Sequence, residues 1–257
     1  MVKVKNTGFQ DILLNGMMND DSDFIPIIAD GEDNDLKNTE IPDVLPVLPL
    51  RNTVLFPGVV LPITVGRKKS LKLIRDVYEG SRLLGTLAQK DYTIDDPKRE
   101  ELFSLGTVAE VLKILEMPDG STSVIIQGKR RFSVNEFVAD DPYYKASINP
   151  LNDLTSHNDS EFNAIVGSLK DLSIKIAQFS ANVPPEATFA VKNIENSTFL
   201  INFICSNTDI NVENKQSLLE IDSLKERGVQ GYQFFGERGA DAGAETGYPE
   251  KGENRHG

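Results

Sequence analysis

The segment from residue 45 to residue 67, LPVLPLRNTVLFPGVVLPITVGR, most constrains what this chain can fold into. It contains two apolar runs of strand character, interrupted by Pro49, Pro57, Pro62 and Gly58. Proline has no backbone N–H to donate to a β ladder, so it is found at strand starts, sheet edges and bulges. The sequence therefore predicts irregular strands here, with backbone groups left available at a sheet edge.

Short β-branched and apolar runs continue to about residue 149 and are typical of strands. A hairpin turn is predicted at 117–121, where Pro118 presets one dihedral and Gly120 accepts a positive φ. One helix is predicted to begin with Ser70 as its N-cap and to end at Gly80. The predicted strands are residues 44–50, 59–65, 83–89, 107–116, 123–127, 131–138 and 143–148.

After a polar linker at residues 151–160, the period of the apolar residues changes from two residues, typical of a strand, to about 3.6 residues, typical of a helix. An apolar stripe that includes Phe162, Leu169 and Phe179 predicts a long amphipathic helix, and further helices are expected up to residue 227. The predicted fold class is therefore α+β. A mostly β, barrel-like domain with one or two helices, residues 41–150, is followed by a small helical bundle, residues 161–227.

Both ends of the chain differ from this pattern. Residues 1–40 hold nine Asp or Glu against three Lys, which is a net charge of −6 out of −12 for the whole chain. This composition predicts a disordered acidic arm. Residues 228–257 hold eight of the nineteen glycines and show no amphipathic period, so an aberrant or disordered Gly-rich tail is predicted.

Several kinds of chemistry lack the residues they need. Cys205 is the single cysteine, and it lies in an apolar run that predicts a buried structural role; His157 and His256 lie in polar surroundings, so no metal site is predicted. No phosphate-binding motif is present, since Gly128-Lys129 is followed by arginine. We therefore predict no catalytic residues, no cofactor and no enzymatic activity in this chain, and, without a signal peptide or a membrane span, a cytoplasmic location.

Several ordered blocks extend the opening segment described above: GRKKS at 66–70, LLGTLAQKD at 83–91 and LGTVAEVLKILEMPDGSTSVIIQGKRRFSV at 105–134. With these blocks, residues 41–150 resemble the N-terminal domain of the Lon ATP-dependent proteases. The resemblance implies a β domain of the PUA-like type, a following helical part, and an ATPase and a Ser-Lys protease further along the parent protein.

The Gly-rich stretch that begins at Gly228 departs from this family, which should continue there as a charged, Leu-rich helix. One hypothesis is a frameshift near Gly228 that leaves a truncated Lon. The alternative is a native flexible tail.

The resemblance implies a non-catalytic module that recognises unfolded or damaged proteins and supports assembly; the alternative is a stand-alone adaptor with no protease. The expected partners are unfolded proteins, further copies of the chain, and the ATPase and protease domains of a full-length parent. Neither nucleic acid nor membrane is expected, since three cations at 129–131 make a weak electrostatic footprint. The predicted substrate-binding residues are Val54, Leu55, Phe56, Val59, Val60, Leu61, Arg67, Lys68 and Lys69.

Overall fold

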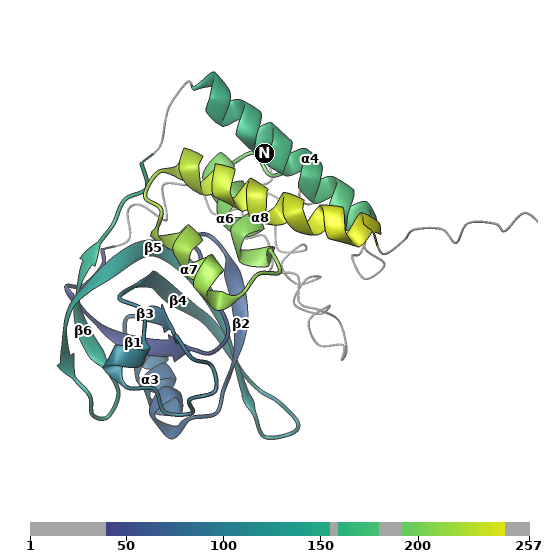
Figure 1. The fold of residues 1–257 in the computed structure, drawn as a ribbon. Helices are drawn as coiled ribbons and strands as arrows, with labels where there is room; N and C mark the ends of the chain where they lie inside the picture. The colour runs from purple at the N-terminus through teal and green to yellow at the C-terminus, as the bar shows by residue number, and fades with distance from the viewer. Residues whose placement is uncertain (1–39, 155–158, 180–191, 245–257) are drawn as a thin grey trace, which may run out of the picture.

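The structure, a computed structural model, describes residues 40–154, 159–179 and 192–244. These residues form a β-barrel with a helical layer on one side of it (Figure 1). The α+β fold class is confirmed. The predicted acidic arm, apart from Glu40, and the last part of the Gly-rich tail lie outside the described residues.

The barrel is built from one mixed, six-stranded sheet in the order β2-β5-β4-β3-β1-β6. β6 pairs with β1 on one side and with β5 on the other, which closes the barrel. β1 and β3 run parallel, and the other neighbours are antiparallel. The strands are β1 Val44–Leu50, β2 Val60–Val65, β3 Leu83–Ala88, β4 Leu105–Glu116, β5 Thr122–Ala139 and β6 Lys145–Pro150.

One long strand, β5, replaces the two strands predicted at 123–127 and 131–138. Gly128-Lys129-Arg130 suggested a break between two strands. Instead, β5 continues through these residues, and its pairing with β4 shifts register between Val108 and Ala109. Such bulges bend a strand without ending it. As a result, the first part of β5 pairs with β2 and the last part with β6.

The predicted turn and the C-terminal end of the predicted helix are confirmed. Met117 N donates to Ser121 O at 2.9 Å, and Gly120 has a φ of 82°. The helix, α3 Lys68–Glu79, ends at Gly80 but has Arg67 as its N-cap instead of Ser70. Leu71 N already donates to Arg67 O at 2.9 Å, so Ser70 is a buried residue of the first turn.

α3 closes one end of the barrel (Figure 1). Its apolar face, Leu73, Ile74 and Val77, is buried among strand residues such as Leu48 and Ile126. A 3-10 turn, η1 Arg99–Glu101, lies between β3 and β4.

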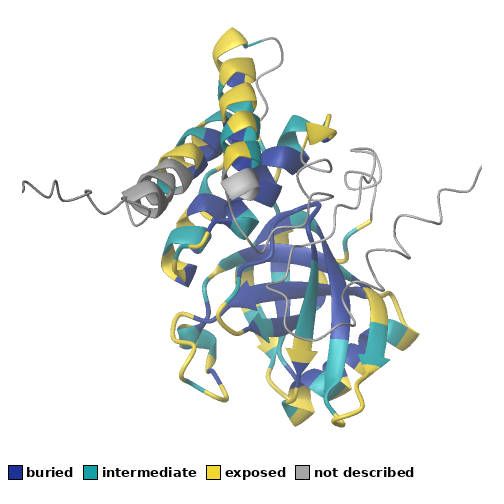
Figure 2. Cartoon of the chain, turned by 90° about the vertical axis from the view of Figure 1, so that its right-hand side faces the viewer, coloured by how far each residue is buried: buried dark blue, intermediate teal, exposed yellow. Residues whose placement is uncertain are grey.

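The helical layer consists of α4 Ser160–Phe179, α6 Ser197–Asn207, α7 Val212–Glu220 and α8 Leu224–Ala244. Asn196 and Asn211 cap α6 and α7 by accepting the backbone N–H three residues later. α4 and α8 lie side by side (Figure 1). Buried residues run along the barrel strands, whereas the helices above them carry exposed residues on their outer sides (Figure 2).

Residues 151–154 of the predicted linker are held at the junction between barrel and helices. Asp153 accepts from Arg131 Nε of β5 at 2.7 Å and from Arg227 Nη2 of α8 at 2.7 Å. Both arginine side chains are at most 1% exposed, so a carboxylate at this point is needed to balance their buried charge. Arg227 also donates to Asn202 Oδ1 of α6 at 2.7 Å. These contacts hold four segments together: the linker, β5, α6 and α8.

The expectation that ordered structure is lost at Gly228 is wrong for residues 228–244, because α8 continues to Ala244. At two of these positions the absence of a side chain lets the helices pack closely. A Cβ at Gly228 would lie 3.2 Å from Ile165 Cγ2 of α4, and a Cβ at Gly231 would lie 3.0 Å from Cys205 Sγ of α6. Packing of this kind offsets the helix-breaking tendency of glycine.

The contact between Gly231 and Cys205 predicts a coupled pair of substitutions. Gly231→Ala alone should bring no net stability, because the gain in helix propensity of about 1 kcal/mol is opposed by overpacking. In a Cys205→Ala background the sulfur is gone, and the same substitution should stabilise by up to about 1 kcal/mol. Urea denaturation of the four proteins measures the coupling, and simple additivity would contradict this packing.

Candidate functional site

A groove with a volume of about 600 Å³ lies between β1 and β2. It exists because β6 pairs only with residues 44–46 of β1, while β2 pairs with β5 alone among the described strands. Two strand edges therefore face each other across the groove. The residues that line it are Leu48, Pro49, Leu50, Arg51, Thr53, Leu61, Pro62, Ile63, Thr64, Val65, Gly66, Arg67, Ser70 and Asp95.

Alternate residues of β2 direct their backbone groups into this groove. Gly128 N donates to Val59 O at 2.9 Å, and the register pairs Val60 with Gln127 and Thr64 with Ser123. Since hydrogen-bonded and non-hydrogen-bonded pairs alternate along an antiparallel ladder, 59, 61, 63 and 65 bond to β5. The N–H and C=O groups of 60 and 64, and the C=O of Pro62, therefore point to the outer edge.

The opposite wall follows the same alternation. Val47 N donates to Tyr144 O at 2.8 Å, whereas Leu50 O accepts from Gln89 N at 2.9 Å on the other side of the strand. Pro49, two residues after Val47, thus directs its carbonyl into the groove and has no N–H there. Pro49 and Pro62 each occupy a position whose backbone N–H would not bond to another strand of the sheet, as expected for prolines at a sheet edge.

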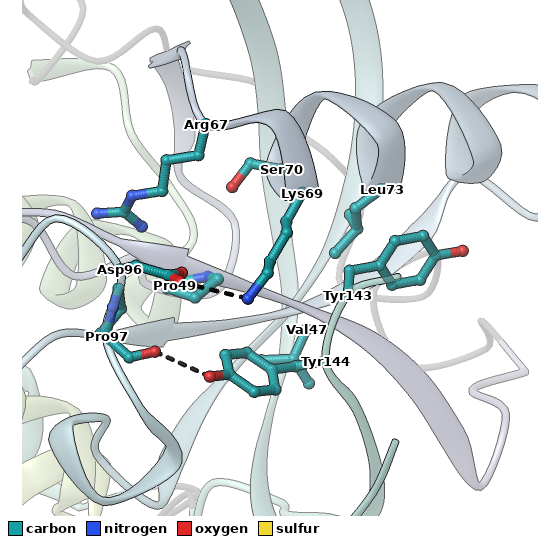
Figure 3. Close-up of a pocket in the computed structure, with 10 residues that line it drawn as sticks. All are labelled: Val47, Pro49, Arg67, Lys69, Ser70, Leu73, Asp96, Pro97, Tyr143 and Tyr144. Carbon is teal, nitrogen blue, oxygen red and sulfur yellow. Dashed lines mark hydrogen bonds and ion pairs between the residues drawn. The ribbon is translucent and has the colours of Figure 1, made fainter. Parts of the chain in front are cut away.

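A smaller hollow of about 20 Å³ continues the groove beside the first turn of α3 (Figure 3). It has room for no more than a water-sized group. Lys69 Nζ lies 3.3 Å from Asp96 Oδ2, and Tyr144 Oη donates to Pro97 O at 2.9 Å. These two contacts hold the loop after β3 against α3 and β6.

The cationic end of the groove is formed by Arg51, Arg67 and Lys69. Arg51 Nη2 lies 3.1 Å from Asp95 Oδ1, but Arg67 Nη2 donates to the neutral amide oxygen of Gln89 at 2.6 Å. Burial, helped by the positive charge of Arg51, lowers the pKa of the Arg67 guanidinium. A half-buried cation bound to an amide remains open to a carboxylate from a ligand.

The predicted binding residues separate into two groups. Three of them, Leu61, Arg67 and Lys69, line the groove or the hollow beside it, and Lys68 is exposed next to them. The other five are each at most 3% exposed, so their side chains belong to the core, and a role for them in substrate binding stays a prediction. These five are Val54, Leu55, Phe56, Val59 and Val60.

The segment from Val54 to Val59 is buried because it connects the barrel to the helical layer. Leu55 O accepts from Thr107 Oγ1 at 2.6 Å, and Pro57 O accepts from Asn202 Nδ2 of α6 at 3.2 Å. Three of its side chains join the apolar cluster of the helices. An apolar run of this kind is compatible with either a buried segment or an exposed strand edge. The position of α6 against it makes it a buried segment.

The cations at 129–131 are used within the fold. Lys129 Nζ lies 2.7 Å from Glu110 Oε2, and Arg130 donates to Leu151 O at 3.1 Å. Arg131 joins the buried pairing with Asp153. No local pattern indicates this last role, because the two carboxylates that pair with Arg131 lie 22 and 91 residues away in the sequence.

Cys205 is buried, as predicted. Desolvation raises the pKa of its thiol to about 12, so the thiol stays protonated near neutral pH. Over the described ranges, no cluster of three or more His, Cys, Asp or Glu is placed to hold a metal ion. No helix in the part of the chain that the structure describes is long and apolar enough to span a membrane.

The comparison with protein families fits this architecture. The family model of the ATP-dependent protease La (LON) substrate-binding domain matches residues 44–234, from the start of β1 into α8. The chain belongs to this family. A Lon substrate-binding domain thus accounts for both the barrel and the helical layer.

Curated relatives of this Lon domain are themselves Lon proteases. The "Lon protease" of Flavobacterium johnsoniae is 46% identical over 216 residues, which are 84% of this chain and 26% of the relative. The "Lon protease" of Cytophaga hutchinsonii is 43% identical over 208 residues, 80% of this chain and 25% of the relative. The chain therefore spans about a quarter of the length of these proteins.

A solved structure confirms the fold of the Lon domain. The N-terminal domain of Mycobacterium avium complex Lon protease superposes with a TM-score of 0.62 at 19% identity. It covers 76% of this chain and 98% of that chain.

Proposed function

We propose that this Lon domain binds unfolded or damaged protein chains by adding an extended segment of the substrate to the outer edge of β2. The supporting observation is the groove itself. It combines backbone groups of Pro62 and Thr64 at a strand edge with an apolar floor. Strand addition of this type takes its affinity from main-chain hydrogen bonds, which every peptide can make. A quality-control protein needs that tolerance.

The floor of the groove gives a preference without strict specificity. Leu48, Leu50 and Val65 are buried, while Leu61 and Ile63 are half-buried. Apolar side chains of a substrate gain roughly 25 cal/mol per Å² of surface that they bury there. Folded proteins keep such side chains inside, so the groove favours chains that have lost their structure.

The other properties of the domain follow from the family. ATP hydrolysis and peptide-bond cleavage are assigned to the parts of a Lon protease outside the matched region, and this chain is proposed to catalyse neither. A cytoplasmic location, assembly with the ATPase and protease parts, and self-association complete the proposal. The names of the relatives support this role over that of a stand-alone adaptor.

A substitution at Thr64 tests strand addition directly. Thr64→Pro removes a backbone donor at the groove edge and no hydrogen bond to β5, so affinity for unfolded casein should fall roughly 2- to 12-fold, the equivalent of one hydrogen bond. Thr64→Val keeps the donor and the strand propensity and is the matched control. Fluorescence anisotropy with labelled casein measures both. Equal affinities for the two variants would reject the proposed edge.

A further inference from the structure

The acidic arm contains a short apolar segment that repeats the pattern of the two groove walls. Phe24-Ile25-Pro26-Ile27 has two apolar residues, a proline and a third apolar residue. Val47–Leu50 in β1 and Val60–Ile63 in β2 follow the same order. A segment of this composition suits an edge position, where a strand pairs on one side and a proline removes no bond.

The charges around the segment match those around the groove. Asp20, Asp21 and Asp23 precede it, and Asp30, Glu32 and Asp33 follow it. At the groove, Arg51, Arg67, Lys68 and Lys69 outnumber Asp95 and Asp96, and Arg67 has an amide for its partner. Acidic flanks therefore meet an excess of positive charge at the α3 end, which favours association and orients it.

The length of the arm allows the contact within one chain. Residues 29–39 lie between this segment and Glu40, the first residue that the structure describes, and these 11 residues can extend over about 36 Å. β1 itself, with seven residues, is only about 20 Å long. The arm can therefore run back alongside β1 and reach the groove, which is lined by the C-terminal half of β1.

We propose that residues Phe24–Ile28 of the same chain add to the outer edge of β2 and fill the groove as an internal competitor of protein substrates. The inference rests on the proposed function, because it assigns the regulation of that same groove. An intramolecular occupant covers the apolar floor when substrate is scarce, and a substrate displaces it by mass action. The arm thereby raises the concentration of unfolded chain that is needed to occupy the groove.

Disulfide trapping in the full chain tests the contact. In a Cys205→Ala background, Ile27→Cys is combined with Thr64→Cys in the groove or with Leu112→Cys, an exposed residue of β4 outside it. Under mild oxidation the 27–64 pair should crosslink within the chain at least about tenfold faster than the 27–112 pair. Equal rates, or a 27–64 crosslink that joins two chains, would overturn the proposal.

Casein binding separates this inference from the proposed function. Ile25→Asp with Ile27→Asp should raise the affinity of the full chain for casein about threefold, as expected if the arm fills two thirds of the grooves. Leu13→Asp with Leu14→Asp adds the same charge elsewhere in the arm and should have no effect. If neither pair of substitutions alters the affinity while Thr64→Pro still lowers it, the arm contact is wrong and the substrate groove stands. If Thr64→Pro also has no effect, both fail.

Discussion

Replacement of Asp153 by Ala is expected to lower the free energy of unfolding by about 3–5 kcal/mol. Asp153 lies between Arg131 Nε and Arg227 Nη2, at 2.7 Å from each, and both arginine side chains are at most 1% exposed. Without the carboxylate, the partners that remain for Arg227 are neutral, Asn202 and Ile221 O, while Arg131 keeps the exposed carboxylate of Asp222 at 3.0 Å. The buried cation of Arg227 would then lie beside a second arginine with no carboxylate bonded to it within the described junction.

Matched variants separate this effect from a general loss of charge. Asp153→Asn keeps an acceptor at the same place and should cost less than Asp153→Ala. Asp140→Ala removes a carboxylate from the exposed pair with Arg99 and should cost much less than Asp153→Ala, because exposed ion pairs contribute little to stability. Urea denaturation followed by circular dichroism measures all three. A cost below 1 kcal/mol for Asp153→Ala would show that the junction does not depend on this pairing.

Gly128→Ala is expected to be at least as damaging, with a loss of about 3 kcal/mol or more. A Cβ at this position would lie 2.2 Å from the carbonyl oxygen of Phe56 and 2.9 Å from its carbonyl carbon. Both atoms belong to the backbone, so no side chain can move aside. Gly58 N donates to Gly128 O at 2.8 Å, and Gly128 N donates to Val59 O at 2.9 Å, so the clash falls where β2 begins.

The control is a glycine with open space around it. Gly167 is an exposed residue of α4, and a Cβ there would meet nothing within 4 Å. Gly167→Ala should therefore stabilise by up to about 1 kcal/mol through helix propensity. Thermal and urea denaturation compare the two proteins. A native-like midpoint for Gly128→Ala would contradict the close approach of β5 to the segment before β2.

Local patterns predicted the parts of the fold that local interactions determine. β1 has the predicted bounds, β3 ends one residue early, and the turn at Gly120 forms as its residues require. The periodic stripe from Phe162 correctly indicated α4. In each case the predictive pattern lies within a short window of the sequence, even though β1 and β3 pair with each other across 38 residues.

Other features of the fold depend on distant partners. Val54 and Phe56 are apolar in a way that suits either an exposed edge or a core, and α6, more than 140 residues away, decides the matter. The glycines of α8 indicate disorder when read alone, but Gly231 faces Cys205 of another helix. The groove was predictable only in part. Its prolines indicated a strand edge, but the sequence does not show that β6 pairs with residues 44–46 of β1 alone and so leaves the rest of that edge open.

The most direct test of the proposed groove is residue-resolved amide hydrogen exchange with and without unfolded casein. Ile63 and Val65 bond to β5 in the free protein, so their amides should exchange slowly in both states. The Thr64 amide points to the groove and should exchange faster than those of Ile63 and Val65 without casein, even with the arm in part of the grooves, then slow by at least about tenfold when a casein strand accepts its hydrogen bond. Casein binding that leaves Thr64 exchange unchanged while slowing amides of the helical layer would contradict the account.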